Sequence, residues 1–321
     1  MNWNSRIISE QELSAYANAP LQNFPSRIAA LIAQQLATWP MLRNATETLN
    51  QAKYKEFSVK GSKVLTQFNP ARIVSTAAKV DAASITARPC FLCAENLPAE
   101  EKGIAFGENY VILCNPFPVL KNHLVVSEKS HTPQSILTRF EDFLDLTEAV
   151  GDQYFTLYNG ASCGASAPDH HHFQACSRAE VPLFDEVENH PRTYTKKSDA
   201  FSSFTLQDYR LNILIARGKN KAELLQRFDE TIKSLQEKIG TDAEPMLNLV
   251  ATSDAHDFTI YLFPRAKHRP ACYFAEGENQ LTVSPAGIDL TGILVVPNPD
   301  HYARISAEDI EKIYSEITLP L

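Results

Sequence analysis

The sequence has few cysteines and no long apolar run, and both absences narrow the class of protein. Six cysteines in 321 residues are too sparse for a disulfide framework, so we interpret them as thiols available for chemistry or metal binding. No run of about 18 apolar residues occurs, as a membrane-spanning helix would need. Residues 1–8 also lack the apolar core of a signal peptide. We therefore expect a cytoplasmic protein with no membrane partner.

An excess of positive charge is missing as well. The formal net charge is -8 and the isoelectric point is near 5.6, which argues against general binding to nucleic acid or to an anionic membrane. Hydrophobic residues make up 44% and charged residues 21%, as in ordinary globular proteins. The expected partner is a small molecule, and a local basic pocket for phosphates is compatible with this balance.

The predicted elements are mostly strands, with helices between them. Strands are expected at residues 54–59, 63–68, 110–114, 123–126, 154–158, 211–215, 247–252, 258–263 and 293–296. Neighbouring strands joined by short turns pair antiparallel, so the pattern predicts an α+β fold with helices packed on antiparallel sheets. A parallel doubly wound sheet would contradict this prediction.

The chain is expected to form two related units, at residues 1–204 and 205–321. The basis is an echo, because Leu-Val-Val at 124–126 precedes His131 by the same interval as Leu-Val-Val at 294–296 precedes His301. The second unit has no His-x-His, so we expect the chemistry in the first. Residues 180–203 are interpreted as a linker, and Thr132-Pro133 predicts the start of a helix.

One stretch, residues 158–174, carries the strongest functional signal. Small and turn-forming residues come first, and a turn of this kind can aim backbone N–H groups at an anion. The run His170-His171-His172-Phe173-Gln174 follows, and in a strand its alternate members His170, His172 and Gln174 share one face. A neutral imidazole beside an amide donor suits nucleophilic attack on phosphorus or metal binding. The alternative is a histidine run without a functional role on a surface loop.

Cys90 and Cys93 form a Cys-x-x-Cys motif with histidines downstream. Thiolates and imidazoles are the ligands of tetrahedral zinc. A redox pair is the rival interpretation, but the strands that follow, with no immediate helix, argue against a thioredoxin-like motif.

With these motifs the chain resembles the histidine triad superfamily. Within it, the chain is most similar to the branch of galactose-1-phosphate uridylyltransferase, diadenosine tetraphosphate phosphorylase and GDP-L-galactose phosphorylase. The resemblance covers roughly residues 67–178. It rests on Asn115 in Cys-Asn-Pro-Phe, His131 after a Leu-Val-Val strand, Asn159 with Gly164-Ala165-Ser166, and the run from His170 to Gln174.

The resemblance implies roles for these residues. His172 would be the nucleophile that becomes a nucleotidyl-histidine, and Gln174 would hold the nonbridging phosphate oxygens. The remaining residues implied in catalysis or substrate binding are Ser166, Gly164, Ala165, Asn115, Asn159, Arg72 and Gln67. A structural zinc ion is implied at Cys90, Cys93, His131 and His170. From its position alone, Arg72 could reach a phosphate, but a lone arginine after a turn is more often a surface charge.

The sequence also departs from its relatives. Asp169 separates Pro168 from His170, whereas the uridylyltransferase motif runs directly from proline to histidine. The second metal site of the uridylyltransferase has no clear counterpart. The basic loop from Arg265 to Arg269 is interpreted either as a phosphate clamp or as a solvated surface loop.

The predicted function is a nucleotidyltransferase or phosphorylase that acts through a covalent nucleotidyl-histidine. Its donor would be a nucleotide sugar or dinucleoside polyphosphate, and its acceptor phosphate or a sugar phosphate. The alternatives are a nucleotide hydrolase of the same superfamily and a zinc-stabilised nucleotide-binding module without turnover. The hydrolases place a third histidine where this chain has Gln174. Because the related uridylyltransferase is dimeric, the resemblance also implies a possible homodimer.

Overall fold

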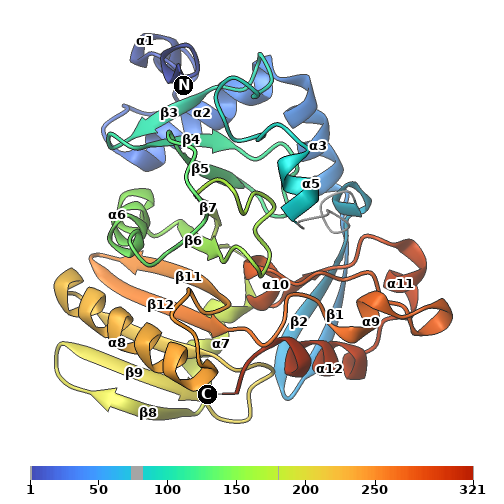
Figure 1. Cartoon of the computed structure of the whole chain (residues 1–321). Coiled ribbons are helices and arrows are strands. Elements are labelled where there is room, and N and C mark those ends of the chain that lie inside the picture. Colours follow the sequence, from blue (N-terminus) through green and yellow to red (C-terminus); the bar gives the residue numbers. More distant parts are fainter. Residues whose placement is uncertain (1, 74–81, 180, 321) are drawn as a thin grey trace.

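The fold is built on one large antiparallel sheet, and the computed structural model describes residues 2–73, 82–179 and 181–320 of the chain (Figure 1). Within these ranges the order of the ten strands is β3-β4-β5-β7-β6-β11-β12-β10-β9-β8. Their bounds are β3 (Gly103–Phe106), β4 (Tyr110–Cys114), β5 (Leu124–Glu128), β6 (Tyr154–Asn159), β7 (His172–Ser177), β8 (Arg192–Lys197), β9 (Phe201–Leu206), β10 (Leu214–Gly218), β11 (Leu247–Asp254) and β12 (Asp257–Pro264). The predicted α+β class with antiparallel pairing is confirmed.

A smaller three-stranded sheet stands beside the large one. It contains the hairpin of β1 (Lys53–Val59) and β2 (Ser62–Phe68), and β13 (Ile293–Val295) pairs with β2 in parallel. This sheet therefore joins an early part of the chain to a late part.

The large sheet contains the same arrangement twice. The first five strands are ordered β3-β4-β5-β7-β6 and the last five β8-β9-β10-β12-β11, so each set is a three-strand meander followed by a hairpin whose second strand pairs with the third. A helix stands between the third and fourth strand of each set, α6 (Phe140–Val150) in the first and α8 (Lys221–Ile239) in the second. The two sets join where β6 pairs with β11.

This repeat differs from the Leu-Val-Val echo in the sequence. The first copy of the echo lies in β5 of the large sheet, but the second overlaps β13 of the small sheet. The counterpart of β5 is β10. The expected division at 204/205 falls inside β9 (Phe201–Leu206), which is the hydrogen-bonded neighbour of β10 in the second set. We propose the division before Arg192 instead.

The helices cover both faces of the large sheet. Besides α6 and α8, they are α1 (Glu10–Ser14), α2 (Phe24–Thr38), α3 (Pro40–Asn50), α5 (Ala82–Thr86), α7 (Pro182–Asn189), α9 (Ala271–Phe274), α10 (Gly287–Leu290), α11 (Pro299–Arg304) and α12 (Ala307–Ile317), with 3-10 turns η1 (Trp3–Ser5), η2 (Pro70–Arg72) and η3 (Gly277–Asn279). None of the helices in the described ranges combines the length and apolar character that crossing a membrane requires.

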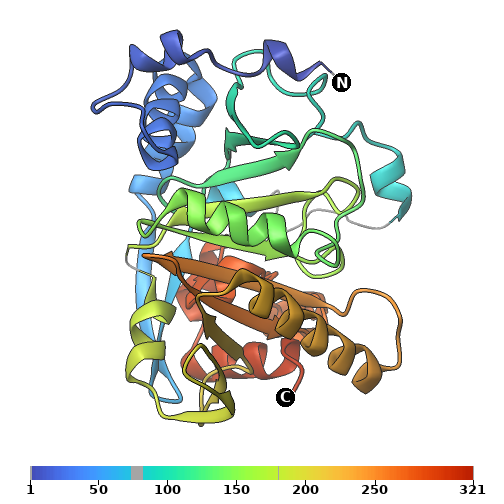
Figure 2. The same cartoon turned by 90° about the vertical axis from the view of Figure 1, so that its left-hand side faces the viewer.

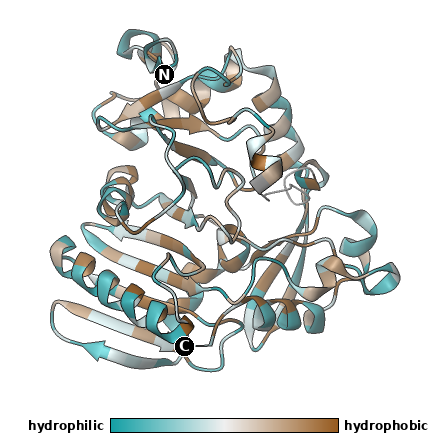
Figure 3. Cartoon of the chain, viewed as in Figure 1, coloured by the Kyte–Doolittle hydropathy of each residue, from teal (hydrophilic) through white to brown (hydrophobic). Residues whose placement is uncertain are grey.

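Helices α2, α6 and α8 share one core on one face of the sheet, and Figure 2 shows α6 and α8 lying over it. Helix α8 begins after Asn220, whose side chain accepts from the backbone N–H of Glu223. Its buried residues Leu224, Phe228 and Ile232 recur every four positions and so face the sheet. Its opposite face is hydrophilic, as Figure 3 shows.

A second core lies on the other face and is formed largely by the end of the chain. Residues of α7, α10, β13 and α12 pack there against side chains of β6 and β12. The segment after β12 therefore returns across the sheet rather than extending it.

Two local predictions are wrong. The helix expected from Thr132 begins only at Phe140, because residues 132–139 form a loop whose Gln134 contacts the backbone of β7. The stretch at 180–203 is not a linker, since its described residues include α7, β8 and the start of β9. Its Pro and charged residues lie at a helix start and on an exposed edge strand, where both are common.

Candidate active site

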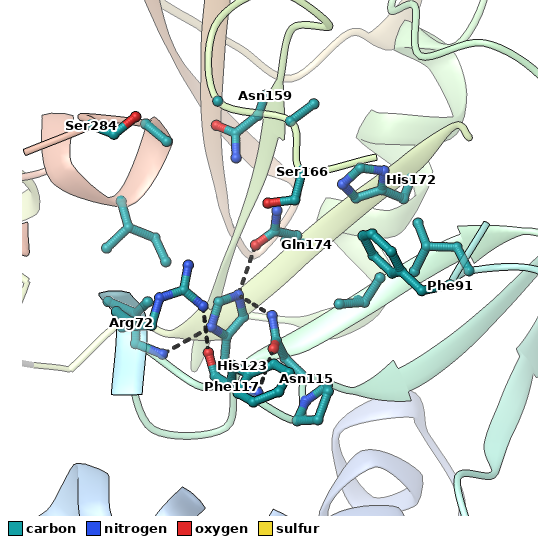
Figure 4. Close-up of a pocket in the computed structure, with 18 of the residues that line it drawn as sticks. Arg72, Phe91, Asn115, Phe117, His123, Asn159, Ser166, His172, Gln174 and Ser284 are labelled. Atoms are coloured by element: carbon teal, nitrogen blue, oxygen red, sulfur yellow. Dashed lines mark hydrogen bonds between the residues drawn. The ribbon is translucent and has the colours of Figure 1, made fainter. Parts of the chain in front are cut away.

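A cavity of about 730 Å³ lies beside β5 and β7 of the first strand set. Eight of the predicted catalytic and binding residues line it: Arg72, Asn115, Asn159, Gly164, Ala165, Ser166, His172 and Gln174. Figure 4 shows most of these side chains around the same opening. The alternation of β7 places His172 and Gln174 on the cavity side, while Phe173 and Ala175 belong to the core on the other face.

His172 is held in one tautomer. Its Nδ1 lies 2.8 Å from the carbonyl oxygen of His170, which can only accept, so Nδ1 carries the hydrogen. None of the described residues bonds to the other ring nitrogen, Nε2, so its lone pair is available. Burial lowers the pKa of His172 to about 4, so the ring is neutral at pH 7. The carbonyl belongs to His170, two residues earlier and just before β7 begins at His172.

Gln134 fixes the backbone around His172 and was missed from the sequence. Its Oε1 accepts from the N–H of His172 at 2.9 Å, and its Nε2 donates to the carbonyl oxygens of His172 at 3.0 Å and Asn159 at 2.9 Å. One buried side chain therefore locks the start of β7 to the end of β6. Its position in a loop predicted as helix hid this role.

His123 orients Gln174 and was also missed. The backbone N–H of Val119 donates to Nδ1 of His123 at 3.2 Å, so the hydrogen of this ring is on Nε2. That Nε2–H donates to Oε1 of Gln174 at 2.7 Å, which turns the Gln174 amide nitrogen away from His123. Burial lowers the pKa of His123 to about 4, and the ring stays neutral. A single histidine eight residues after Asn115 gave no separate signal.

The loop between β6 and β7 packs against the end of the chain. Oδ1 of Asn159 accepts from the N–H of Gly287 and from the amide of Asn248, both at 2.8 Å. Gly164 has φ +114, and a Cβ there would lie 2.5 Å from the Cβ of Ala286. Only glycine fits this approach. Ser166, two residues later, is exposed to the cavity.

Arg72 and Gln67 have different surroundings. Arg72 lines the cavity and donates through Nη1 to the carbonyl oxygen of Phe117 at 2.7 Å. Gln67 is fully buried, and its amide donates to the hydroxyl of Tyr54 and the carbonyl of Val119, both at 2.8 Å. It is not among the cavity residues, so its side chain braces the wall rather than facing a ligand.

The opposite wall comes from the end of the chain. His268, Arg269 and Ser284 line the cavity, and Nε of Arg269 donates to the hydroxyl of Ser284 at 3.0 Å. Arg265 is instead buried and donates to Asn248 at 2.5 Å and to backbone carbonyls. The basic loop thus divides into a structural arginine and a cavity-facing pair, His268 and Arg269.

His171 faces away from the cavity into the core. Its ring lies 4.7 Å from that of Phe173 and near Tyr110 and Tyr158. Neither ring nitrogen has a hydrogen-bond partner among the described residues. Burial lowers the pKa of His171 to about 3. Truncation of this buried side chain would leave a cavity.

The four predicted metal ligands meet in one cluster. The ligand atoms of Cys90, Cys93, His131 and His170 all lie within 4.8 Å of one another. Nδ1 of His170 is 3.3 Å from Sγ of Cys90, and Nδ1 of His131 is 3.3 Å from Sγ of Cys93. Neighbouring ligands around tetrahedral zinc are separated by about 3.3 to 3.8 Å, given the usual zinc–ligand distances. The donor set and its spacing therefore fit zinc.

The surroundings of the cluster support this use. Nε2 of His170 lies 2.7 Å from the carbonyl oxygen of Glu128, which leaves Nδ1 for the metal. The amide of Asn96 donates to the carbonyl of Cys90 at 2.8 Å. Asp169, the residue that departs from the related motif, is paired with Arg88 at 2.8 Å. Since His170 lies two residues before His172, the cluster anchors the strand that carries the candidate nucleophile.

Known proteins share this architecture. Residues 31–177 match the family described as a domain of unknown function, DUF4922, and no curated protein matches the chain. Yeast Ap4A phosphorylase Apa2 superposes with a TM-score of 0.56 and 14% identity, covering 88% of this chain and 95% of that one. The same yeast protein with Ap4A gives 0.56 at 13% identity, over 87% and 97%. A GalT-like protein from Arabidopsis thaliana has a TM-score of 0.40 at 14% identity, over 84% and 99%.

The yeast phosphorylase and this chain thus share a fold over nearly their whole lengths. The fold that the resemblance implied is thereby confirmed.

Proposed function

We propose that this protein is a nucleotidyltransferase or phosphorylase that forms a covalent nucleotidyl-histidine at His172. The observation that carries the proposal is the fixed, neutral imidazole inside the cavity, with Nδ1 bonded to a carbonyl and Nε2 free. An imidazole in this state is a ready nucleophile toward phosphorus.

The proposed reaction has two balanced steps. Nε2 of His172 attacks the α-phosphorus of the donor, the N–P bond forms, and the P–O bond to the leaving phosphate breaks with its electron pair on that oxygen. The leaving group departs as a phosphate anion and takes no proton from the protein. An oxygen of the acceptor phosphate then attacks the same phosphorus, the N–P bond breaks, and the imidazole returns to its neutral form.

The residues around His172 fit this chemistry. The Gln174 amide, oriented by His123, donates to a nonbridging oxygen whose charge grows in the transition state. Ser166 and the backbone of Gly164 and Ala165 support the neighbouring phosphates. The Gln174 amide cannot protonate a leaving group. Its position therefore favours nucleotidyl transfer, in which the leaving group departs as an anion, over hydrolysis.

The rest of the cavity fits a long polyanionic substrate. Arg72 and Arg269 both line the cavity, so a bound polyphosphate would meet positive charge from two separate parts of the chain. The volume is in the range of small-molecule sites. The yeast phosphorylase of the same fold binds Ap4A, and we propose a dinucleoside polyphosphate or nucleotide sugar as donor here.

The zinc proposed at Cys90, Cys93, His131 and His170 would be structural. With four protein ligands its shell is closed, so it would hold the Cys-x-x-Cys loop against β7 without binding substrate.

A mass-spectrometric experiment tests the proposal. Protein mixed with nucleoside diphosphate sugars and dinucleoside polyphosphates should gain one nucleoside monophosphate, and peptide mapping should place it on His172. Addition of phosphate or a sugar phosphate should remove the adduct and release a new nucleotide. Binding without any adduct or turnover would favour the nucleotide-binding module instead.

A further inference from the structure

Glu101 is a buried carboxyl group that the proposed reaction does not use. It lies in the loop between the Cys-x-x-Cys motif and β3, is only 5% exposed, and lines the same cavity as His172. Among the described residues its carboxylate has no hydrogen-bond or ion-pair partner, whereas buried acidic groups are normally paired.

Arg6 lies close but does not neutralise this group by direct contact. Its guanidinium donates to the backbone carbonyls of Ala94 at 3.1 Å and Leu97 at 2.8 Å. Arg6 therefore holds the loop that presents Glu101. Glu101 itself is among the residues that line the cavity.

The cavity around this loop has flat apolar walls. Phe91 is 46% exposed, Phe117 44% and Met41 42%, although each is large and hydrophobic and each lines the cavity. Exposed apolar side chains grouped in one pocket mark a ligand site. Figure 4 shows the ring of Phe117 beside Asn115 and the ring of Phe91 toward His172. Aromatic faces of this kind stack on nucleobases.

We propose that this end of the cavity binds the nucleobase of the donor and that Glu101 selects guanine. The inference rests on the proposed function for its choice of a nucleotide as ligand. An ionised carboxylate has two acceptor oxygens and no donor. Guanine offers two adjacent donors, N1–H and the exocyclic amine, so the two edges match in both positions. Adenine and cytosine each place an acceptor beside their amine, and uracil has only one donor.

The protonation state of Glu101 makes guanine binding depend on pH. Burial raises the pKa of Glu101 to about 8 in the free protein, with Arg6 acting in the opposite direction and the thiol of Cys114 nearby. Guanine binds the ionised form, so its binding at pH 7 releases a proton and its affinity rises with pH up to about 8. Adenine would instead match the protonated acid, which donates to its N1, and would release no proton.

Calorimetric titration of the full chain with GDP, ADP, CDP and UDP tests this selection. Wild-type protein should bind GDP at least about tenfold more tightly than the others, and repeating the GDP titration at pH 7 in buffers of different ionisation enthalpy should show proton release. Glu101→Gln should weaken GDP binding by about ten- to a hundredfold, the scale of one bidentate base contact. It should also narrow or reverse the preference over ADP, because a glutamine amide matches adenine.

Glu100→Gln is the matched control, because Glu100 is an exposed neighbour with the same charge. It should leave the order of affinities unchanged. Equal affinity of wild-type protein for the four nucleotides, a preference for ADP, or an equal loss for all four in Glu101→Gln would overturn the inference. An equal loss with a lowered melting temperature would identify Glu101 as structural.

The inference and the proposed function can fail separately. The titrations are repeated in His172→Ala, where no adduct can form. A GDP preference with no adduct in wild-type protein would remove the covalent mechanism and keep the guanine site. Adducts formed equally well from uridine, adenosine and guanosine donors would keep the covalent mechanism and remove the guanine site.

Discussion

Nε2 of His123 donates to Oε1 of Gln174 at 2.7 Å, and this bond decides which end of the Gln174 amide faces the cavity. We expect His123→Phe, which keeps a ring but loses both hydrogen bonds, to slow nucleotidyl transfer by about tenfold, while Gln174→Ala slows it by about a hundredfold. Single-turnover rates of adduct formation measure both effects.

A double-mutant cycle separates positioning from general damage. If His123 acts through Gln174, adding His123→Phe to Gln174→Ala should cost little more than Gln174→Ala alone. Full additivity of the two losses would contradict the positioning role.

His172→Ala should abolish adduct formation and turnover while nucleotides still bind, because the variant loses the attacking Nε2 but keeps the surrounding donors. His172→Gln, which retains a polar side chain, should be equally inactive. Mass spectrometry under the conditions that label wild-type protein measures the adduct. Nucleotidylation that persists in His172→Ala would overturn the covalent mechanism.

Purified protein should contain one zinc ion per chain, and Cys90→Ser should lose it and melt several degrees lower. Three remaining ligands cannot close the shell that ties the Cys90 loop to His170. Elemental analysis and thermal melting measure the two effects. Cys272→Ser, a partly buried thiol outside the cluster, is the control, and equal zinc in both variants would argue against the site.

Gly164→Ala should reduce transfer activity by more than its loss of unfolding free energy would explain. The new methyl group would meet Ala286 at 2.5 Å and would force apart the loop between β6 and β7 and the end of the chain. Gly107→Ala provides the comparison, since Gly107 also has a positive φ of +54 but nothing lies within 4 Å of the place a Cβ would take. Both should lose about 1 kcal/mol or more of unfolding free energy from backbone strain, but only Gly164→Ala should lose transfer activity.

His171→Leu should stabilise the protein, because it keeps the volume of a buried ring whose two nitrogens have no partner among the described residues. A rise of a few degrees in melting temperature is expected, with adduct formation retained. His171→Ala should instead lower the melting temperature through the cavity it leaves. A destabilised His171→Leu would show that the imidazole makes a polar contact in solution.

Local patterns account for the parts of the site that the sequence predicts. The two-residue period of a strand places His172 and Gln174 on one face, and the Cys90–Cys93 spacing with two histidines anticipates the metal cluster. The first prediction depends only on neighbouring positions in one strand, and the second on a short motif with well-known metal-binding chemistry.

The parts that sequence reasoning missed depend on distant pairings. Gln134 contacts His172 across a loop that local cap signals predicted as helix, and Glu101 has no distinguishing neighbour in the sequence. The repeat of the sheet shows the same limit, since β5 corresponds to β10 through strand order and not through any shared residues. The Leu-Val-Val echo was a local similarity without a structural counterpart.

The return of the chain end to the cavity also sets an order of assembly during synthesis. A nascent chain that has completed β7 already carries His172 and the four proposed zinc ligands, but the wall with His268, Arg269 and Ser284 does not yet exist. The pocket is completed only when that later segment has folded back against Asn159 and Gly164. A partly synthesised chain would therefore hold the proposed nucleophile without its full substrate site.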